Sequence, residues 1–146
     1  MKRQISLMLK ILLLLSLSSL AACSQSVVIH SESEDVRVRV DLAATPEQQE
    51  KGLMFVASMP EDKGMLFVFD SEGPRQFWMK NTKIPLDLLF INSKKSIVDI
   101  KENFQPCTAD PCEVYAAKAP SMYVLEVNAG FVQKYGIRKF DSVEIG

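Results

Sequence analysis

Alternating apolar and polar residues predict a strand near the start of the folded region. In VRVRVDLA, residues 36–43, valine and leucine alternate with arginine and aspartate. A period of two with one apolar side is typical of a strand that packs one face on a core and exposes the other. The apolar VVIH just before it is a candidate first strand within an otherwise polar tether, residues 23–35.

The hydrophobic period changes after this strand, and TPEQQEKG predicts a helix of about two turns. Thr45 is a good N-cap, Pro46 suits the first helical position, and Gln48 stands where a capping box needs it. A second short helix is predicted within NAGFVQKYG, with Asn128 as its cap and Gly136 as a left-handed stop.

Six further apolar segments, rich in β-branched and aromatic residues, predict the remaining strands. Gly, Pro and Asn residues separate them, and the first four are expected to form an antiparallel meander. Together they indicate an α+β fold, mainly antiparallel β, with one compact twisted or barrel-like sheet and two short helices over residues 36–146. The segments are 64–70, 75–80, 86–91, 96–103, 122–127 and 142–145.

The N-terminus has the layout of a secretory signal. Three basic residues and no acid precede the run ILLLLSLSSL, which is shorter than a membrane span. LAAC, residues 20–23, resembles the lipobox of bacterial lipoproteins, which implies removal of residues 1–22 and a lipid on Cys23. Ser24 implies, by the same resemblance, an outer-membrane anchor facing the periplasm. The alternative is an ordinary signal peptide with an incidental cysteine.

Charge changes once the signal is removed, because fourteen Lys and Arg then oppose eighteen Asp and Glu, a net charge of −4. A chain of this length suits one domain with one core. Nucleic acid selects basic surfaces, so a mildly acidic domain is not expected to bind it.

Cys107 and Cys112 are the two cysteines that remain once Cys23 carries a lipid. In an oxidising envelope, two cysteines five residues apart around a proline predict a structural disulfide. A redox-active pair is the alternative, but the spacing is not Cys-x-x-Cys and no basic residue lies between them. Two cysteines without a nearby histidine are too few for a zinc site, so no metal or cofactor is predicted.

Five blocks, read in order, resemble the family known as domain of unknown function 192: KGLMF, GMLFVF, FWMKNTKIPLDLLFI, YVLEVNAGF and GIRKFDSV. The resemblance covers about residues 36–145. It implies a largely β single domain, often exported, and no known activity. Two positions differ from the family pattern, because Val56 stands where arginine is frequent and Phe140 where glycine is frequent.

Residues 76–91, QFWMKNTKIPLDLLFI, place a tryptophan, a lysine, an asparagine and an aspartate in an otherwise apolar run. On a strand, Trp78 and Lys80 share one face. They can bind a ligand by stacking and charge, or Trp78 can pack while Lys80 lays its stem on it and reaches water. Asn81 is expected to shape the following turn and is also a candidate ligand contact.

Asp87 lies in LDLLFI, a segment expected to be buried on both faces. An unpaired carboxylate is costly there, so Asp87 needs hydrogen-bond donors. The backbone amides of the turn NTKIP are the structural candidates. The functional alternative is a carboxylate beside Lys80, with a perturbed pKa, lining a cleft.

Glu126 lies on a predicted antiparallel strand, where exposure to water is its expected fate. If it instead shares a cleft with Asp87, the two carboxyls and Lys80 are candidate catalytic residues for general acid–base work. The one histidine, His30, lies in the tether or first strand, so a Ser-His-Asp or Cys-His system is not predicted.

These features predict a small lipid-anchored envelope protein that binds a ligand or partner around Trp78, Lys80 and Asp87 and is not an enzyme. A hydrolase or lyase that uses Asp87 and Glu126 on an envelope saccharide is the first alternative. The second is a periplasmic Cu(I)-binding protein, since thioethers are soft ligands. Methionine also fills cores, the expected role here. The methionines concerned are Met54, Met59, Met65, Met79 and Met122.

Overall fold

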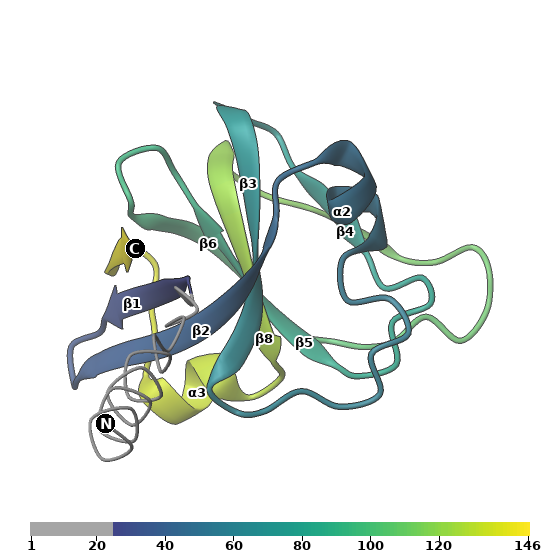
Figure 1. Ribbon diagram of the computed structural model, residues 1–146, viewed down its shortest axis with the longest axis horizontal. Helices are drawn as coiled ribbons and strands as arrows, with labels where there is room; N and C mark the ends of the chain where they lie inside the picture. The colour runs from purple at the N-terminus through teal and green to yellow at the C-terminus, as the bar shows by residue number, and fades with distance from the viewer. Residues whose placement is uncertain (1–24) are drawn as a thin grey trace, which may run out of the picture.

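Seven strands form one curled sheet, a half-barrel, in the computed structural model, which describes residues 25–146 (Figure 1). Two further strands form a separate small sheet. In chain order the elements are β1 Ser26–His30, β2 Asp35–Ala43, α2 Pro46–Lys51, β3 Lys63–Gly73, β4 Gln76–Trp78, β5 Leu86–Ile91, β6 Ile97–Phe104, β7 Val114–Ala116, β8 Ser121–Asn128, α3 Phe131–Tyr135 and β9 Ser142–Ile145.

The strand order of the large sheet is β6-β5-β8-β3-β2-β1-β9, and β4 pairs with β7 in the small one. All pairs are antiparallel except β2 and β3, which are parallel because the segment containing α2 crosses over between them. The mainly antiparallel α+β fold predicted from the sequence is confirmed. The expected meander of β3 to β6 is wrong, since β3 pairs with β2 and β8 rather than β4. Among these four strands, only β5 and β6 pair with each other.

The predicted first strand VVIH is part of the sheet, because β1 pairs with both β2 and β9. His30 ends β1, and its Nδ1 lies 2.7 Å from Oδ1 of Asp35. The predicted signal peptide, residues 1–22, and the predicted lipidation site Cys23 lie outside the described residues. Within residues 25–146, no helix is long and apolar enough to span a membrane.

The N-cap of α3 lies two residues later than predicted. Asn128 is the last residue of β8, where its side-chain amide donates to the carbonyls of Met59 and Pro60. The cap is instead Gly130 at φ 88, a left-handed conformation that glycine adopts without steric cost. Gly136 is the left-handed stop, as predicted.

Each face of the large sheet carries a hydrophobic core, where a single core was expected. Leu89 and Ile91 of β5 belong to the core that includes Phe131 of α3. Leu88 and Phe90 belong to the core on the opposite face, beneath the small sheet. All six residues of β5 are buried, which explains why this strand is a continuous apolar run rather than an alternating one.

The two edges of the large sheet meet at one corner. Ser96, just before β6, bridges Ser142 of β9, and Ile97 hydrogen-bonds through its backbone to Asp141 and Phe140. This contact covers part of both sheet edges. Phe140 holds φ 77, a left-handed conformation that favours glycine, which accounts for the glycine that the sequence resemblance places there.

Candidate functional site

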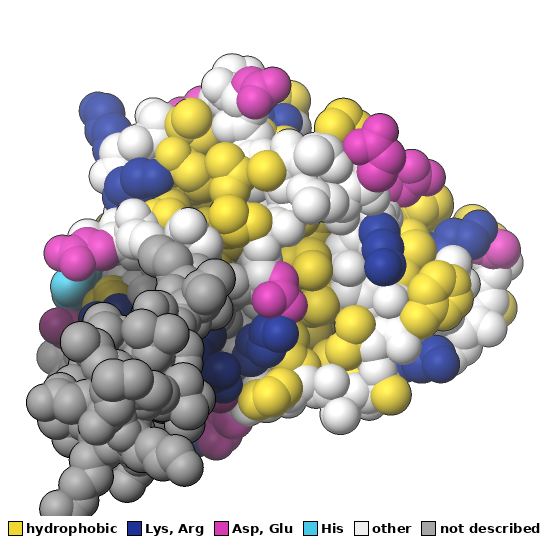
Figure 2. Space-filling view, in the orientation of Figure 1, with side chains coloured by type: hydrophobic (Ala, Val, Ile, Leu, Met, Phe, Trp, Pro, Cys, Tyr) yellow, Lys and Arg dark blue, Asp and Glu magenta, His cyan; other side chains and the backbone are white. Residues whose placement is uncertain are grey.

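A groove lies between α2 and the segment that contains β4, and we call it the Trp78 groove. Figure 2 shows acidic, basic and apolar side chains interspersed at this end of the molecule, over α2 and β4. The inner part, about 30 Å³, reaches Glu126 and shares Glu50, Lys51, Met54, Trp78 and Lys80 with the outer part. The outer part, about 490 Å³, is lined by Glu47, Glu50, Lys51, Met54, Trp78, Lys80 and Asn81.

Local contacts hold the last turn of α2 over this groove. The capping box predicted at residues 45–48 is present and starts the helix. The Nε2 amide of Gln49 donates to a β3 carbonyl at 2.8 Å. Gly52 ends the helix at φ 45, and a Cβ there would lie 3.1 Å from the ring of Phe67. A side chain at this position would therefore strain the backbone and crowd the groove wall.

The indole of Trp78 stands at the rim of the groove. In β4, Phe77 points inward, with its ring centroid 5.0 Å from that of Phe67, and Trp78 points outward opposite Val114 of β7. The Trp78 side chain is 46% exposed. Nζ of Lys80 lies 5.5 Å from the indole centroid, a distance at which cation and ring attract each other.

Asn81 turns the chain after Trp78, as the sequence predicts. Its backbone is left-handed at φ 58, and its carbonyl accepts a 2.9 Å hydrogen bond from the amide of Phe55. The side-chain amide of Asn81 lies 3.8 Å from Sδ of Met54. These contacts join the loop after α2 to the loop after β4, so both walls of the groove are held together.

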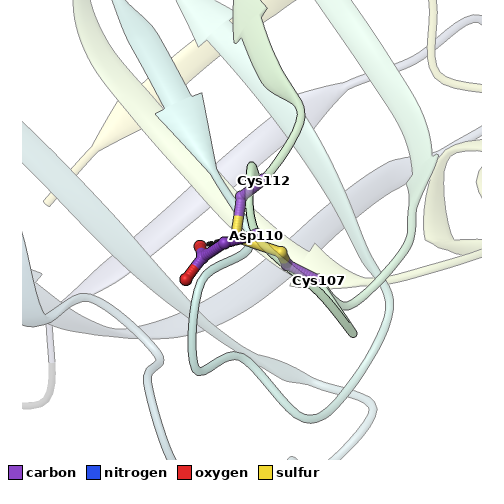
Figure 3. Close-up of side chains that lie close together, drawn as sticks. All are labelled: Cys107, Asp110 and Cys112. Atoms are coloured by element: carbon purple, nitrogen blue, oxygen red, sulfur yellow. Dashed lines mark hydrogen bonds between the residues drawn. A yellow bond between two sulfur atoms is a disulfide. The ribbon is translucent and has the colours of Figure 1, made fainter.

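A disulfide loop supports the groove from behind. The sulfur atoms of Cys107 and Cys112 are 2.08 Å apart, as the sequence predicts (Figure 3). The amide of Cys107 donates to the carbonyl of Met79, and Asp110 lies 3.5 Å from Nζ of Lys80. Asp110 and the two sulfurs lie within 4.8 Å of one another, but the disulfide leaves no thiolate for a metal.

Glu126 forms the floor of the inner groove. It lies on β8, between Leu88 of β5 and Met65 of β3. Its side chain is only 5% exposed, and Oε2 has no hydrogen-bond partner. Burial raises the pKa of this carboxyl from 4.5 to about 8, because the charged form loses its hydration. The expected exposure to water is wrong, since α2 and the small sheet cover this face.

Asp87 is fully buried and bonded at both oxygens. Its Oδ1 accepts from the amide of Asn103 at 2.8 Å, and Oδ2 accepts from the amide of Val132 at 2.9 Å. The expectation of backbone donors is confirmed, but they come from β6 and α3, and not from the turn NTKIP. Asp87 thus has a structural role, as a carboxylate that stabilises the first turn of α3.

The two carboxyls proposed as a catalytic pair face opposite sides of the sheet. In the register of β5 and β8, Asp87 opposes Val127, whereas Glu126 opposes Leu88. Side chains on successive strand residues point to opposite faces. The structure therefore corrects the hypothesis that Asp87 shares a cleft with Lys80 and Glu126, and it corrects the prediction of a ligand contact at Asp87.

Asp99 is a buried carboxylate that the sequence analysis did not single out. Oδ1 accepts from Nζ of Lys139, and Oδ2 accepts from the hydroxyl of Tyr115 and the amide of Lys118. Burial raises the pKa of Asp99, but these donors outweigh it and lower that pKa to about 2. Burial and the bond to Asp99 raise the pKa of Tyr115 to about 12. This cluster ties β6, β7 and the segment before β9 together.

The methionines considered as thioether ligands lie in different surroundings. Met79 is buried in the core beneath the small sheet, with Met59 and Met65 packed against that core. Met54 lines the groove, and Met122 lies on β8. Core filling is thus confirmed for three of them, and Cu(I) binding stays a prediction.

Comparisons with known proteins identify relatives whose activity is not established. The family model DUF192, described as "Uncharacterized ACR", matches residues 27–145. A crystal structure from Sinorhizobium meliloti 1021, described as a candidate transcription regulator, is 39% identical, with a TM-score of 0.77 over 84% of this chain and 94% of that one. A protein of unknown function from Novosphingobium aromaticivorans DSM 12444 is 34% identical, with a TM-score of 0.77 over 82% of this chain and 83% of that one. No curated protein matches the sequence.

Proposed function

The chain belongs to the DUF192 family, and we propose that this member is a lipid-anchored ligand-binding protein of the bacterial cell envelope. One observation carries the proposal of binding: the indole of Trp78, 46% exposed, borders every part of the groove. Tryptophan combines a large apolar area with a polar tip and is enriched where proteins bind partners. The groove surrounds it with charged and amide side chains that can orient a ligand.

The position of β1 supports the anchoring part of the proposal. Two residues separate Cys23 from β1, so a lipid on Cys23 would hold that end of the sheet near the bilayer. Figure 1 shows β1 toward the left end of the long axis, and α2 and β4 on the other side of the crossing strands of the large sheet. The Trp78 groove would then face away from the membrane, toward soluble ligands or partners of the envelope.

Two other functions are not proposed. A hydrolase built on Asp87 and Glu126 requires both carboxyls in one cleft, and they lie on opposite faces of the sheet. One relative is described as a candidate transcription regulator, but residues 23–146 of this chain carry a net charge of −4, which opposes binding to a phosphate backbone.

Fluorescence offers a direct test, because Trp78 is the only tryptophan of the chain. The full-length protein, purified from membranes in detergent, would be titrated with neutral, cationic and anionic envelope fragments. These probes are a trimer of N-acetylglucosamine, a lysine-containing peptide and glycerol phosphate. We expect at least one of them to change the emission of Trp78, with an affinity confirmed by calorimetry.

Two truncations separate binding from folding. Trp78→Ala should weaken binding of that probe by tenfold or more in calorimetry, because the stacking surface is removed. Val114→Ala is the matched control, since Val114 is 51% exposed, faces Trp78 across β4 and β7, and does not line the groove. Equal affinities of both variants and the wild type, or no response to any probe, would overturn the proposal.

A further inference from the structure

Glu126 differs from the two other buried carboxyls of the described residues in having no hydrogen-bond donor at Oε2. Within residues 25–146, the buried acidic side chains are Asp87, Asp99 and Glu126. The first two have hydrogen-bond donors at both oxygens. Buried polar atoms almost always have a hydrogen-bond partner. An oxygen without one at the floor of a groove therefore indicates that a bound molecule supplies the missing partner.

The surroundings of Glu126 favour its neutral form. The flanking residues on β3 and β5 are Met65 and Leu88, which do not titrate. Charged side chains reach the inner groove from α2 and from the segment after β4, and they are Glu50, Lys51 and Lys80. None of them is within ion-pair distance of Glu126, and burial raises its pKa to about 8. At neutral pH the carboxyl therefore carries a proton that it can donate.

The inner groove limits what can reach this carboxyl. Its volume of about 30 Å³ admits one or two water-sized groups. Its walls are the backbone of Gly52 and the side chains of Leu53, Phe67 and Phe77. A small uncharged group, such as a hydroxyl or a carbonyl oxygen, fits this space without the desolvation cost of an ion.

The rim of the groove also favours a neutral ligand. Two carboxylates, Glu47 and Glu50, stand among two ammonium groups, Lys51 and Lys80, so neither an anion nor a cation meets a surface of one sign. Hydroxyl groups both donate and accept hydrogen bonds, so they can bond to all four of these charged side chains. The face of Trp78 provides an apolar surface on which a ring can lie.

We infer that the Trp78 groove binds a neutral saccharide, with one oxygen of the sugar accepting a hydrogen bond from the protonated carboxyl of Glu126. This inference rests on the proposed binding function of the groove and adds the chemical class of its ligand. Trp78 supplies the platform, and the charged rim contacts the remaining hydroxyls. Glu126 is a binding residue here, because it provides a donor that an ionised carboxylate lacks.

Calorimetry of the full-length protein with the N-acetylglucosamine trimer tests this inference. If only the protonated form of Glu126 binds, affinity should fall about tenfold between pH 6 and pH 9, given a pKa of about 8. Glu126→Gln keeps a neutral donor of similar shape at every pH. This variant should bind the trimer with the same affinity at both pH values, and Glu126→Ala should bind it weakly at both.

The possible results distinguish the inference from the function on which it rests. Trimer binding that needs Trp78 but shows no loss at pH 9 would overturn the role of Glu126 and leave the groove as a binding site. A second result would be that only the lysine peptide binds in a Trp78-dependent way, more tightly at pH 9, and not to Glu126→Gln. This result would overturn the inference of a neutral ligand and indicate a cationic one. No Trp78-dependent binding of any probe would overturn both.

A measurement without ligand checks the protonation of Glu126 independently. In protein carrying ¹³C at its glutamate carboxyls, one resonance should titrate with a midpoint near 8. The same resonance should be missing from Glu126→Gln. A midpoint near 4.5 for this carboxyl would overturn the inference even if a saccharide binds.

Discussion

At the scale of single residues, the pKa values of two buried carboxyls are shifted in opposite directions. The pKa of Asp99 falls to about 2 because three donors stabilise its charged form, whereas that of Glu126 rises to about 8 because burial acts alone. Sequence patterns do not distinguish them, since each is an acidic residue in an apolar strand. The difference lies in the side chains and amides that other elements bring to each carboxyl.

Replacing Glu126 should change how stability depends on pH. Its folded pKa of about 8 exceeds the unfolded value of 4.5, so between these values the folded protein holds a proton that the unfolded chain releases. The free energy of unfolding therefore falls as pH rises, by about 1.4 kcal/mol per unit and as much as about 5 kcal/mol in total. Glu126→Gln removes this contribution.

Urea unfolding at pH 5 and pH 8 measures the effect. We expect Glu126→Gln to gain stability relative to the wild type as pH rises, with the difference growing through the interval. Parallel pH profiles for the two proteins would show that Glu126 titrates near its ordinary value in the folded state.

At the scale of elements, Asp87 connects three of them. It lies on β5 and accepts hydrogen bonds from Asn103, at an irregularity of β6, and from Val132, in the first turn of α3. The cap residue of α3, Gly130, has no side chain to bond these amides. A carboxylate from a distant strand thus provides the N-terminal stabilisation that a local Asn or Asp usually provides.

Asp87→Asn should therefore destabilise the fold by about 3 kcal/mol. The substitution replaces one carboxylate oxygen with an NH2 group, and this donor would face a backbone N–H that then has no acceptor. Chemical denaturation gives the magnitude, and hydrogen exchange should accelerate at the amides of Val132 and Asn103. Asp62→Asn is the control, since the Asp62–Arg39 pair is exposed and its loss should cost much less stability than the loss of a buried carboxylate. Similar costs in both variants would contradict this role for Asp87.

At the scale of the whole molecule, the strand β1, which the proposed anchor precedes in the sequence, lies apart from the Trp78 groove. Two residues separate β1 from Cys23, and α2 and β4, which carry the groove, lie on the other side of the crossing strands of the large sheet (Figure 1). A protein held in this way presents its binding surface to the periplasm. Anchoring by two or more acyl chains is stable, whereas one chain gives only reversible attachment.

Cys23→Ser should abolish this attachment, because it removes the sulfur on which the lipid is proposed. Cell fractionation is expected to find the wild type in the membrane fraction, released by detergent and not by salt. Cys112→Ser is the control, since it also removes one cysteine and should stay in the membranes. Mass spectrometry should detect acyl chains on Cys23, and an unmodified residue there would contradict the lipoprotein proposal.

Much of the local structure could be predicted from the sequence. Alternation identified β2, the capping box identified the start of α2, and the short Cys107–Cys112 spacing predicted the disulfide. Trp78, Lys80 and Asn81 do line the outer groove, because β4 and the turn after it are local features. Each of these depends on residues a few positions apart, which interact whatever the rest of the chain does.

The tertiary structure decided which elements meet. The parallel pairing of β2 with β3, the pairing of β4 with β7, and the cover that α2 and the small sheet place over Glu126 all join distant residues. The hydrogen bonds to Asp87 also join distant residues, because the donors are the amides of Asn103 and Val132 and not, as expected, those of the turn NTKIP. Strand pairing depends on side-chain packing across the sheet more than on any property of one strand, so the sequence alone determines the strands but not their neighbours.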